Sequence, residues 1–240
     1  MAKSSKFTIN RKSLLIDKGI SFEFIEAYKS LRTNLQFESI NNTIKKLIIT
    51  SSIPGEGKTT VALNLAISLA ENGQKVLLVD TDFRKPQLHK YLKLESNKIG
   101  GLTTVLAGLS PIENCIAHFS DLCIYVLTAG PIPPNPTELL SSPKFKELVD
   151  KLSDQYDYII FDTPPVSVVT DAAILSRICD GVLFVLRHNF TTHEIASIAK
   201  ENLEKVDAKI LGCIFNAFNV KKTNKSYKYY HYKKYGYKYN

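Results

Sequence analysis

The sequence predicts an α/β fold in which a mostly parallel, doubly wound sheet is covered by helices on both faces. Short apolar runs, as expected for buried strands, alternate along the chain with segments of helical periodicity. A glycine-rich turn joins the first of these runs to an apolar helix, and acidic residues end two later runs. The 240 residues, 44% of them hydrophobic, are enough for one core of this kind.

The chain begins with a basic, polar segment, residues 1–20, that has no sustained periodicity and is expected to be mobile. A helix is predicted from residue 21 to about residue 37. Its apolar stripe consists of Phe24, Tyr28, Leu31 and Leu35. A second stripe is charged and consists of Glu26, Lys29 and Arg32; by spacing alone it is typical of a solvated face with local ion pairs.

Residues 51–60 are the stretch around which the rest of the chain is organised. An apolar run at 47–49 precedes it, and an apolar helix at 61–70, closed by Asn72 and Gly73, follows it. A strand, a glycine turn, a Lys-Thr pair and a helix N-terminus in this order are typical of the phosphate-binding loop (P-loop) of nucleotide hydrolases and transferases. The residues predicted to bind nucleotide are Pro54, Gly55, Glu56, Gly57, Lys58, Thr59 and Thr60.

Within this loop, Lys58 is predicted to bridge the β- and γ-phosphates, and the Thr59 hydroxyl to ligate Mg²⁺. Ser52 departs from the usual pattern, in which a glycine opens the loop. The alternative interpretation is a tight strand-to-helix turn with a surface lysine. Nucleotide binding is favoured because the flanking strand, the helix and two further acidic motifs all agree with it.

Acidic residues end two later apolar runs. Asp80 and Asp82 follow the run 76–79, and Asp162 ends the run 158–161. In a doubly wound sheet the carboxyl ends of the strands face the ligand crevice. These carboxylates are therefore predicted to ligate a metal or to hydrogen-bond with a hydroxyl there. Asp162 matches the Walker-B position, whose carboxylate holds Mg²⁺ directly or through water. For each motif the alternative is an ordinary solvated strand end.

The remaining elements follow from periodicity and turn residues. Between the two acidic motifs we expect a short helix at 102–107, a strand at 122–127, a rigid proline-rich loop at 130–138, and helices at 137–142 and 144–156. After them we expect a helix at 171–178, a strand at 181–186, a helix at 193–206 with a capping box of Thr191 and Glu194, and a strand at 210–216. Asn216, at the end of that strand, either hydrogen-bonds an adenine or is a loop asparagine.

Hydropathy, charge and cysteine content indicate where the protein works and which kinds of site it lacks. No apolar run reaches the roughly 20 residues of a membrane span, so we expect a cytoplasmic protein whose membrane association comes through a partner. The net charge of +8 comes from the two ends of the chain, because residues 19–220 contain 19 basic and 22 acidic residues. The cysteines form no metal-binding or redox motif and are expected to be small core residues: Cys115, Cys123, Cys179 and Cys213.

The C-terminal segment, residues 219–240, is expected to be a disordered tail, because from residue 226 onward it has no aliphatic residue to join a core. Lysines are interleaved there with seven of the chain's twelve tyrosines: Tyr227, Tyr229, Tyr230, Tyr232, Tyr235, Tyr237 and Tyr239. Such a segment either stacks on single-stranded nucleic acid or accepts phosphate on its tyrosines. A P-loop that holds ATP favours phosphorylation.

As a set, these residues resemble the bacterial tyrosine kinases of capsule and exopolysaccharide gene clusters. The resemblance covers nearly the whole chain. It rests on the P-loop, the stretch Asp80-Thr81-Asp82-Phe83-Arg84, residues 130–138, the stretch Phe161-Asp162-Thr163-Pro164-Pro165 and the tyrosine-rich end. The short form without membrane spans resembles the split, Gram-positive type, in which a separate membrane protein of the chain-length-regulator kind supplies an activating cytoplasmic tail.

The resemblance implies an ATP-dependent tyrosine kinase that phosphorylates its own tail and regulates capsular or exopolysaccharide synthesis and chain length. It implies that Lys58 and Thr59 bind ATP and Mg²⁺, that Asp82 and Asp162 serve the metal, and that Arg84 contacts the nucleotide. Lys58, Asp80, Asp82 and Asp162 would form the catalytic set, with Asp80 the stronger candidate for accepting the tyrosine proton. The kinase domain would span residues 46–218.

The N-terminal unit, residues 21–45, is implied to mediate oligomerisation. Glu26, Lys29 and Arg32 resemble the family's Glu-x-x-Arg-x-x-Arg motif, with Lys29 in place of the first arginine, which removes a bidentate donor. The resemblance implies a homo-oligomer, an octameric ring in the family, that lies at the inner face of the membrane through its activator partner. It also implies a cognate tyrosine phosphatase and no nucleic-acid partner.

Two alternatives of other classes stay open from the sequence. Partition and cell-division-site ATPases share the fold, but their loop begins with Lys-Gly-Gly, where this chain has Ile53-Pro54-Gly55. A nucleic-acid-binding ATPase could use the basic tail, and a nucleic-acid pulldown with and without residues 221–240 separates it from a kinase.

Overall fold

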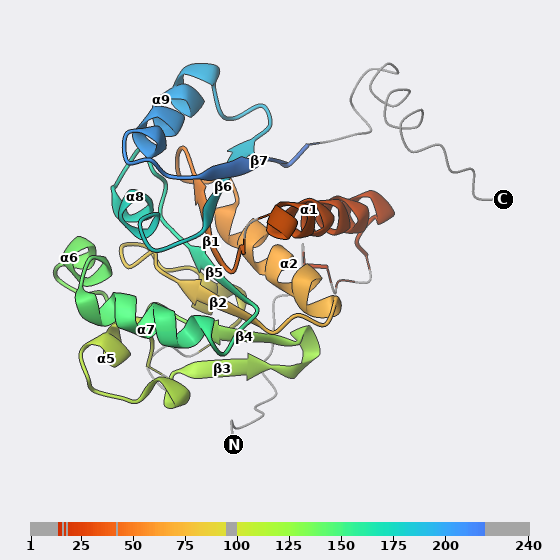
Figure 1. Cartoon of the computed structure of the whole chain (residues 1–240). Helices are drawn as coiled ribbons and strands as arrows, with labels where there is room; N and C mark the ends of the chain where they lie inside the picture. The colour runs from red at the N-terminus through yellow and green to blue at the C-terminus, as the bar shows by residue number, and fades with distance from the viewer. Residues whose placement is uncertain (1–13, 16, 18, 42, 95–99, 219–240) are drawn as a thin grey trace, which may run out of the picture.

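A seven-stranded sheet runs through the centre of the molecule (Figure 1). The computed structural model describes residues 14, 15, 17, 19–41, 43–94 and 100–218. The strands lie in the order β3-β4-β2-β5-β1-β6-β7, and neighbours are parallel except for β3 and β4. Their bounds are β1 Lys46–Ser51, β2 Val76–Asp80, β3 Ile116–Phe119, β4 Ile124–Leu127, β5 Tyr158–Asp162, β6 Gly181–Arg187 and β7 Ile210–Asn216.

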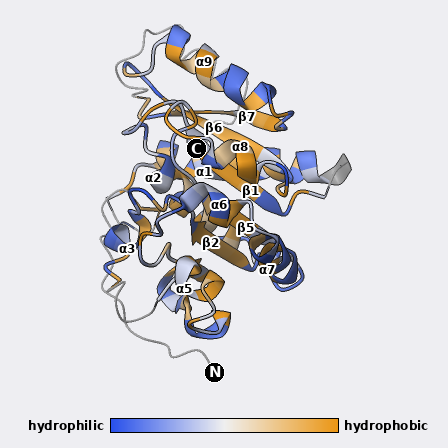
Figure 2. Ribbon diagram, turned by 90° about the vertical axis from the view of Figure 1, so that its left-hand side faces the viewer, coloured by the Kyte–Doolittle hydropathy of each residue, from blue (hydrophilic) through white to orange (hydrophobic). Residues whose placement is uncertain are grey.

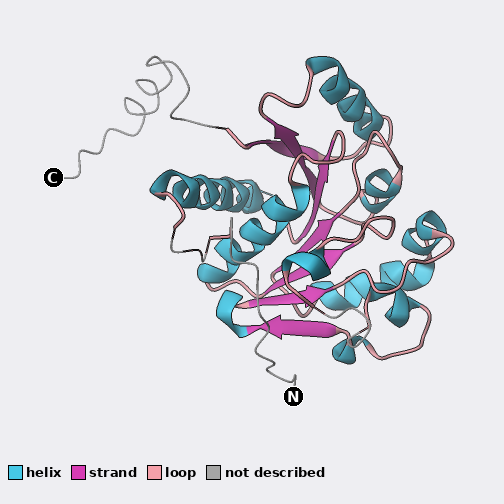
Figure 3. Cartoon of the chain, turned by 180° about the vertical axis from the view of Figure 1, so that it is seen from behind, coloured by secondary structure: helices cyan, strands magenta, loops and turns pink. Residues whose placement is uncertain are grey.

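Helices cover both faces of the sheet, as Figure 3 shows from behind. One layer contains α1 Phe22–Asn41, α2 Lys58–Glu71 and α3 Leu88–Tyr91. The other contains α5 Leu102–Leu106, α6 Pro136–Leu140, α7 Pro143–Ser153, α8 Asp171–Leu175 and α9 His193–Glu204. Two short 3₁₀ turns, Ile112–Asn114 and Ser120–Leu122, flank β3. This arrangement confirms the predicted doubly wound α/β fold.

Side chains of the central strands alternate between two apolar layers. In β1, Leu47 and Ile49 pack in the layer of α1 and α2, whereas Ile48 packs with α7, α8 and α9. Every residue of β2 and β5 is buried, as expected for parallel strands covered on both sides. The central strands are accordingly orange in Figure 2, and the outer faces of α7 and α9 carry blue, hydrophilic residues.

The helix that follows the P-loop, α2, is the most buried helix of the fold, with residues 61–70 all buried. Its C-terminus is the predicted one, with Asn72 as C-cap and Gly73 at φ +82°. Its N-cap is Gly57, at φ +89°, a left-handed conformation that favours glycine. A Cβ at Gly57 would also overlap the side-chain amide of Asn216. The P-loop therefore has its shape imposed by both glycine and a packed neighbour.

The N-terminal helix α1 is one turn longer than predicted and packs on α2 through its expected apolar stripe. Tyr28 and Leu35 are buried, and Arg32 Nη1 donates to the Ser68 carbonyl of α2 at 2.7 Å. Burial raises the pKa of Tyr28 to about 12, against a hydrogen bond from Asn64 that lowers it. Most of the segment predicted to be mobile, residues 1–20, lies outside the described residues. Leu14, however, is buried in the core.

The structure differs from the predicted elements in further places, among them the short helix α3, which was not predicted, and the helices α7, α8 and α9, which end two or three residues early. The strand expected from residue 122 begins at Ile124, because residues 120–122 form a 3₁₀ turn that ends at Cys123 with φ +55°. The strand β3, only four residues long, was missed because it is too short for a periodic signal. The N-cap of α9 is Thr192, whose hydroxyl accepts from Ile195 N, so the predicted capping box on Thr191 is wrong.

The cysteines do not all lie in the core as predicted. Cys115 is buried and Cys179 is half-buried, but Cys123 and Cys213 are exposed. Cys213 faces outward because β7 is an edge strand whose side chains alternate between half-buried and exposed positions. Within the ranges that the structure describes, no helix combines the length and the apolarity needed to cross a bilayer.

Candidate functional site

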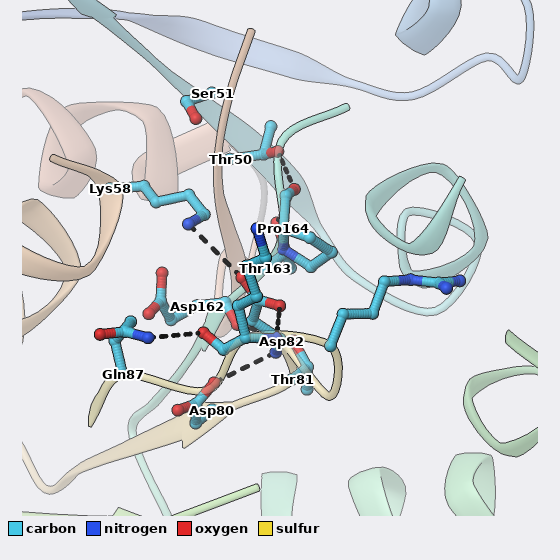
Figure 4. A network of polar contacts seen from close by, with 12 residues as sticks. Thr50, Ser51, Lys58, Asp80, Thr81, Asp82, Gln87, Asp162, Thr163 and Pro164 are labelled. Atoms are coloured by element: carbon cyan, nitrogen blue, oxygen red, sulfur yellow. Dashed lines mark hydrogen bonds and ion pairs between the residues drawn. The ribbon is translucent and has the colours of Figure 1, made fainter. Parts of the chain in front are cut away.

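Lys58 and the three predicted aspartates, Asp80, Asp82 and Asp162, come together at the carboxyl edge of the sheet, where β2, β5 and β1 lie side by side (Figure 4). The register pairs Asp80 at the end of β2 directly with Asp162 at the end of β5. Asp162 in turn pairs with Ile49 of β1, two residues before the P-loop begins. Parallel pairing therefore brings the two acidic motifs and the P-loop together, as the strand-end argument predicted.

Lys58 points across this edge toward Asp82, in the acidic motif at the end of β2. Its Nζ lies 3.6 Å from Asp82 Oδ2, and both side chains are largely buried, with 13% and 8% of their surface exposed. The other carboxylate oxygen, Asp82 Oδ1, accepts from Lys85 N at 2.9 Å, which fixes the rotamer of Asp82. The Asp82 carboxylate thus holds Lys58 at the mouth of the site. A bound phosphate group would be a second anionic partner for Lys58, beside Asp82 or in its place.

Asp162 carries a carboxylate oxygen that no described residue satisfies. The residue is buried, and its Oδ1 is inaccessible without a hydrogen-bond partner. Burial raises the pKa of Asp162 to about 6; Lys58 and a hydrogen bond from Thr59 lower it, and Asp82 raises it further. An orphaned oxygen of this kind in a buried acid requires an explanation, and a bound cation is one.

Asp80 is equally buried, and each of its carboxylate oxygens accepts a hydrogen bond. Its Oδ1 accepts from Asp82 N and its Oδ2 from Leu88 N, each at 3.1 Å. Burial raises the pKa of Asp80 well above its ordinary range, and the neighbouring charges of Asp162 and Asp82 raise it further, against the lowering by the two backbone donors. Both oxygens therefore shape the loop between β2 and α3, and it is Asp82 that faces Lys58.

Arg84, predicted to contact nucleotide, lies in an ion pair with Asp171, the first residue of α8. Its Nε is 3.3 Å from Asp171 Oδ2, and its Nη2 donates to Thr137 Oγ1 at 3.1 Å. Thr137 Oγ1 also donates to Asp171 Oδ1 at 3.2 Å. This triad ties the loop after β2 to α6 and α8, and thereby fixes the end of the proline-rich loop beside the site.

Asn216, predicted to contact adenine or to be a loop residue, braces the P-loop. Its Nδ2 donates to the Glu56 carbonyl at 2.8 Å, and its Oδ1 accepts from Ala217 N. The Glu56 side chain is fully buried and turned away from the loop mouth, whereas Pro54 and Gly55 are exposed. Thr60 Oγ1 donates to Tyr91 of α3 at 3.3 Å, which ties the base of the loop to that helix.

Comparison with known proteins places this site in a family. An AAA-domain family model matches residues 44–211. The chain is 45% identical over 205 residues to tyrosine-protein kinase YwqD of Bacillus subtilis, an alignment that covers 85% of each chain. The chain belongs to the bacterial tyrosine-protein kinases.

Solved structures agree with this assignment of family and fold. The crystal structure of the chimerical protein CapA2B2 matches with a TM-score of 0.81 at 36% identity, covering 86% of this chain and 90% of that one. The kinase domain of Escherichia coli ETK matches with a TM-score of 0.78 at 33% identity, covering 90% and 80%. The resemblance drawn from the sequence motifs is confirmed, and the fold is that of a P-loop nucleotide-binding protein.

A Mg²⁺ ion fits the residues that this tyrosine kinase presents at the edge. Among the residues with described positions, no three His, Cys, Asp or Glu side chains gather into a metal site made by protein alone. Magnesium rarely uses such a cage; it takes one or two carboxylates and completes its shell with substrate phosphates and water. Thr59, Asp82 and the orphaned Asp162 oxygen lie next to a phosphate-binding loop and carry oxygen donors of the kind that such a site uses.

The predicted oligomerisation residues lie on α1 of the kinase, away from the edge. Glu26 and Lys29 form an exposed ion pair at 2.8 Å, as expected for a solvated helix face with local ion pairs. Arg32 instead donates a hydrogen bond to α2. The predicted phosphoacceptor tyrosines, Tyr227 to Tyr239, lie outside the described residues.

Sequence reasoning missed Asp171, Thr137, Arg187 and Thr191 as residues that support the site. Asp171 and Thr137 each sit in the first turn of a short helix, where an acid or hydroxyl is normally a local cap. Nothing in the local sequence distinguishes such a cap from a partner of Arg84. The one available signal was Arg84 itself, two residues after Asp82, because a loop arginine beside an acidic motif is a candidate to pair with a carboxylate elsewhere in the fold.

Proposed function

We propose that this kinase binds Mg²⁺·ATP at the P-loop and transfers the γ-phosphoryl group to tyrosine hydroxyls, its own C-terminal cluster among them. The observation that carries the proposal is the convergence of Lys58, Asp82 and the orphaned Asp162 oxygen at one strand edge. Phosphoryl transfer needs positive charge to stabilise the phosphate oxygens and carboxylates to bind the metal ion. The cation, the two carboxylates and the N-terminus of α2 provide these groups.

In the proposed reaction, a tyrosine oxygen forms a bond to the γ-phosphorus while the bond to the bridging oxygen of ADP breaks. Backbone N–H groups of the P-loop and the start of α2 hold the β- and γ-phosphates. Lys58 leaves Asp82 and neutralises charge on the transferred group. Bound Mg²⁺ would offset charge on the β- and γ-oxygens, with Thr59 and Asp162 as the residues that hold it. Asp82, which the family resemblance also implied for the metal, has only Oδ2 left for the reaction, because its Oδ1 accepts from Lys85 N.

The acceptor proton leaves the tyrosine as the new bond forms, and we assign its acceptance to Asp82. The sequence favoured Asp80 for this role, but both Asp80 oxygens accept backbone hydrogen bonds within the fold. Asp82 keeps an oxygen at the mouth of the site beside Lys58. Asp80 then acts as a positioning residue that holds Asp82. A carboxylate is a weak base at neutral pH, so orientation and charge stabilisation supply most of the acceleration.

In this proposal Arg84 and Asn216 support nucleotide binding through the loops that they hold. Arg84 fixes the chain after Asp82 by its contacts with Asp171 and Thr137. Asn216 fixes the carbonyl of Glu56 within the P-loop.

We further propose that the kinase regulates capsular or exopolysaccharide synthesis and works at the inner face of the membrane through an activator protein. The support is the family resemblance of its motifs and the likeness to the CapA2B2 chimera. Oligomerisation through the exposed face of α1, with Glu26 and Lys29, and reversal by a cognate tyrosine phosphatase belong to the same proposal.

The experiment is a phosphotyrosine map by mass spectrometry after incubation with Mg²⁺·ATP, for the native chain and for Lys58→Met. The variant should lose phosphotyrosine by a factor of about 10²–10³ or more, because it removes the cation aimed at the transferred group. Lys151→Met, at the exposed end of α7, serves as the matched control and should label normally. Persistent phosphotyrosine on purified Lys58→Met would defeat the assignment of the site.

A further inference from the structure

A buried carboxylate lies inside the loop that must receive a triphosphate. Glu56 is fully inaccessible to solvent, between Gly55 and Gly57 of the P-loop. A carboxylate facing the phosphates would repel them, so its orientation decides whether the loop can bind an anion. The partners of Glu56 determine that orientation.

Those partners come from the loop itself and from the turn between β6 and α9, residues 187–192, here called the β6–α9 turn. Glu56 Oε2 accepts from Ile53 N at 2.8 Å, which closes the P-loop on itself. Glu56 Oε1 accepts from the Thr191 hydroxyl and, at 3.4 Å, from Arg187 N. The Thr191 hydroxyl in turn accepts from Arg187 N at 3.0 Å, so its donor and an acceptor site are both in use.

The β6–α9 turn also contacts the exposed tip of the loop. Arg187 Nη1 donates to the Gly55 carbonyl at 2.9 Å, while the guanidinium lies 5.1 Å from the ring centre of Phe190. A Cβ added to Gly55 would approach the same ring at 3.6 Å. The turn therefore bonds to both the buried side chain and the outer carbonyl of the P-loop.

From these contacts we propose that Thr191 is a positioning residue for the nucleotide-binding site, acting through Glu56. A P-loop binds phosphate with backbone N–H groups, and their directions depend on the shape of the loop. Glycines at φ +87° and +89° leave the isolated loop free to adopt other shapes. The Thr191 hydroxyl selects one shape by holding the Glu56 carboxylate away from the phosphates.

The proposal rests on nucleotide binding at this loop and predicts which kinetic constant changes. The loop holds phosphates in the ground state and in the transition state alike, so loosening it removes uniform binding. Loss of the Thr191 hydroxyl should therefore raise KM for ATP and leave kcat little changed.

The test compares Thr191→Val, Thr191→Ser and the neighbouring control Thr192→Val in the full chain. Thr191→Val removes the hydroxyl with little change of shape, and Thr191→Ser keeps it. Thr192→Val removes a hydroxyl that caps α9 and does not contact Glu56. We measure the Kd of Mg²⁺·ADP by calorimetry, KM and kcat for ATP, and thermal unfolding. Thr191→Val should raise both Kd and KM roughly tenfold or more, as loss of a hydrogen bond to a charged group would.

Thr191→Ser should restore native constants, and Thr192→Val should lower the melting temperature without weakening Mg²⁺·ADP binding. A native Kd for Thr191→Val, failure of serine to restore it, or an equal rise in Kd for Thr192→Val would overturn the proposal. If Thr191→Val does not fold, Thr191→Ala removes the hydroxyl without added bulk and is judged by the same outcomes. Failure of the native chain to bind Mg²⁺·ADP would instead defeat the proposed nucleotide site.

Discussion

At the scale of single residues, the site is defined by the different surroundings of three aspartates. Asp80 has two backbone donors, Asp82 has a backbone donor and Lys58, and Asp162 keeps one oxygen without a partner. Three buried carboxylates and one nearby cation leave excess negative charge when nucleotide and metal are absent. Burial is the main cause of the raised pKa values of Asp80 and Asp162, and the neighbouring carboxylates raise them further.

Replacing Asp162 by asparagine should stabilise the nucleotide-free protein at neutral pH while abolishing kinase activity. The pKa of Asp162 rises on folding from its ordinary value of 3.8 to about 6. Its contribution to stability is therefore fully present below the unfolded value and is lost as pH rises through about 6. The expected gain for Asp162→Asn is about 3 kcal/mol at about pH 7.5 and about half of that at about pH 5.

Urea unfolding at the two pH values measures this gain. Asp154→Asn, at the exposed end of α7, is the control and should bring no gain. A loss of stability for Asp162→Asn at neutral pH, or a gain that grows toward acid, would contradict the burial argument.

At the scale of elements, loops from distant parts of the chain are joined by buried polar contacts around the site. Arg84 links the loop after β2 to α6 and α8, and Thr191 links the β6–α9 turn to the P-loop. The short helices α6 and α8 have five residues each and would not persist alone in water. Their positions depend on these contacts and on the apolar layer beneath.

Removal of Arg84 should lower both the free energy of unfolding and the kinase activity. Arg84→Met leaves the fully buried Asp171 carboxylate with its Thr137 hydrogen bond but without its cation. Breaking a buried pair typically costs about 3–5 kcal/mol. Since the Arg84 side chain is 40% exposed, solvent screens the pair, and we expect a loss below that range, about 2–3 kcal/mol, in urea unfolding.

The double variant Arg84→Met/Asp171→Asn should recover part of this stability, because the unpaired charge is gone. Lys200→Met, which breaks the exposed pair with Glu204 on α9, is the control and should leave the urea midpoint unchanged. A double variant no more stable than Arg84→Met would show that the ion pair is not the source of the loss.

At the scale of the whole molecule, charge is divided between the body and the ends of the chain. Residues 19–220 carry three more acids than bases, whereas residues 221–240 carry seven lysines and no acid. A basic, tyrosine-rich segment is attracted to an acidic body, and each phosphate added to a tyrosine brings about −1.5 to −2 charges. Phosphorylation would therefore progressively cancel the attraction, which suits a substrate that must leave the site after transfer.

Changing the seven C-terminal tyrosines to phenylalanine should remove most autophosphorylation while Mg²⁺·ADP binding stays native. The reason is that phenylalanine keeps the ring and lacks the accepting oxygen, and the P-loop is untouched. Quantitative phosphotyrosine mass spectrometry and calorimetry give the two readouts. A control in which Tyr125 of β4 alone is replaced by phenylalanine keeps the tail and the P-loop contacts and should label normally. Unchanged labelling of the sevenfold variant would move the acceptor elsewhere.

The sequence by itself determined the alternation of most strands and helices along the chain, the P-loop motif, and the acids at the ends of β2 and β5. These features are local: period, turn residues and strand ends are written in consecutive positions, and parallel pairing then makes the edge common to all. Short features, such as the strand β3 and the N-cap of α9, were missed because each depends on too few residues to give a periodic signal.

Only the tertiary structure decided which side chains meet. Glu56 and Thr191 are 135 residues apart, and Arg84 and Asp171 are 87 apart, so no local pattern records either contact. The exposure of Cys213 likewise follows from β7 being at the edge of the sheet. Hydrogen bonds act over about 3 Å, and whether two distant residues come that close depends on the register and packing of everything between them.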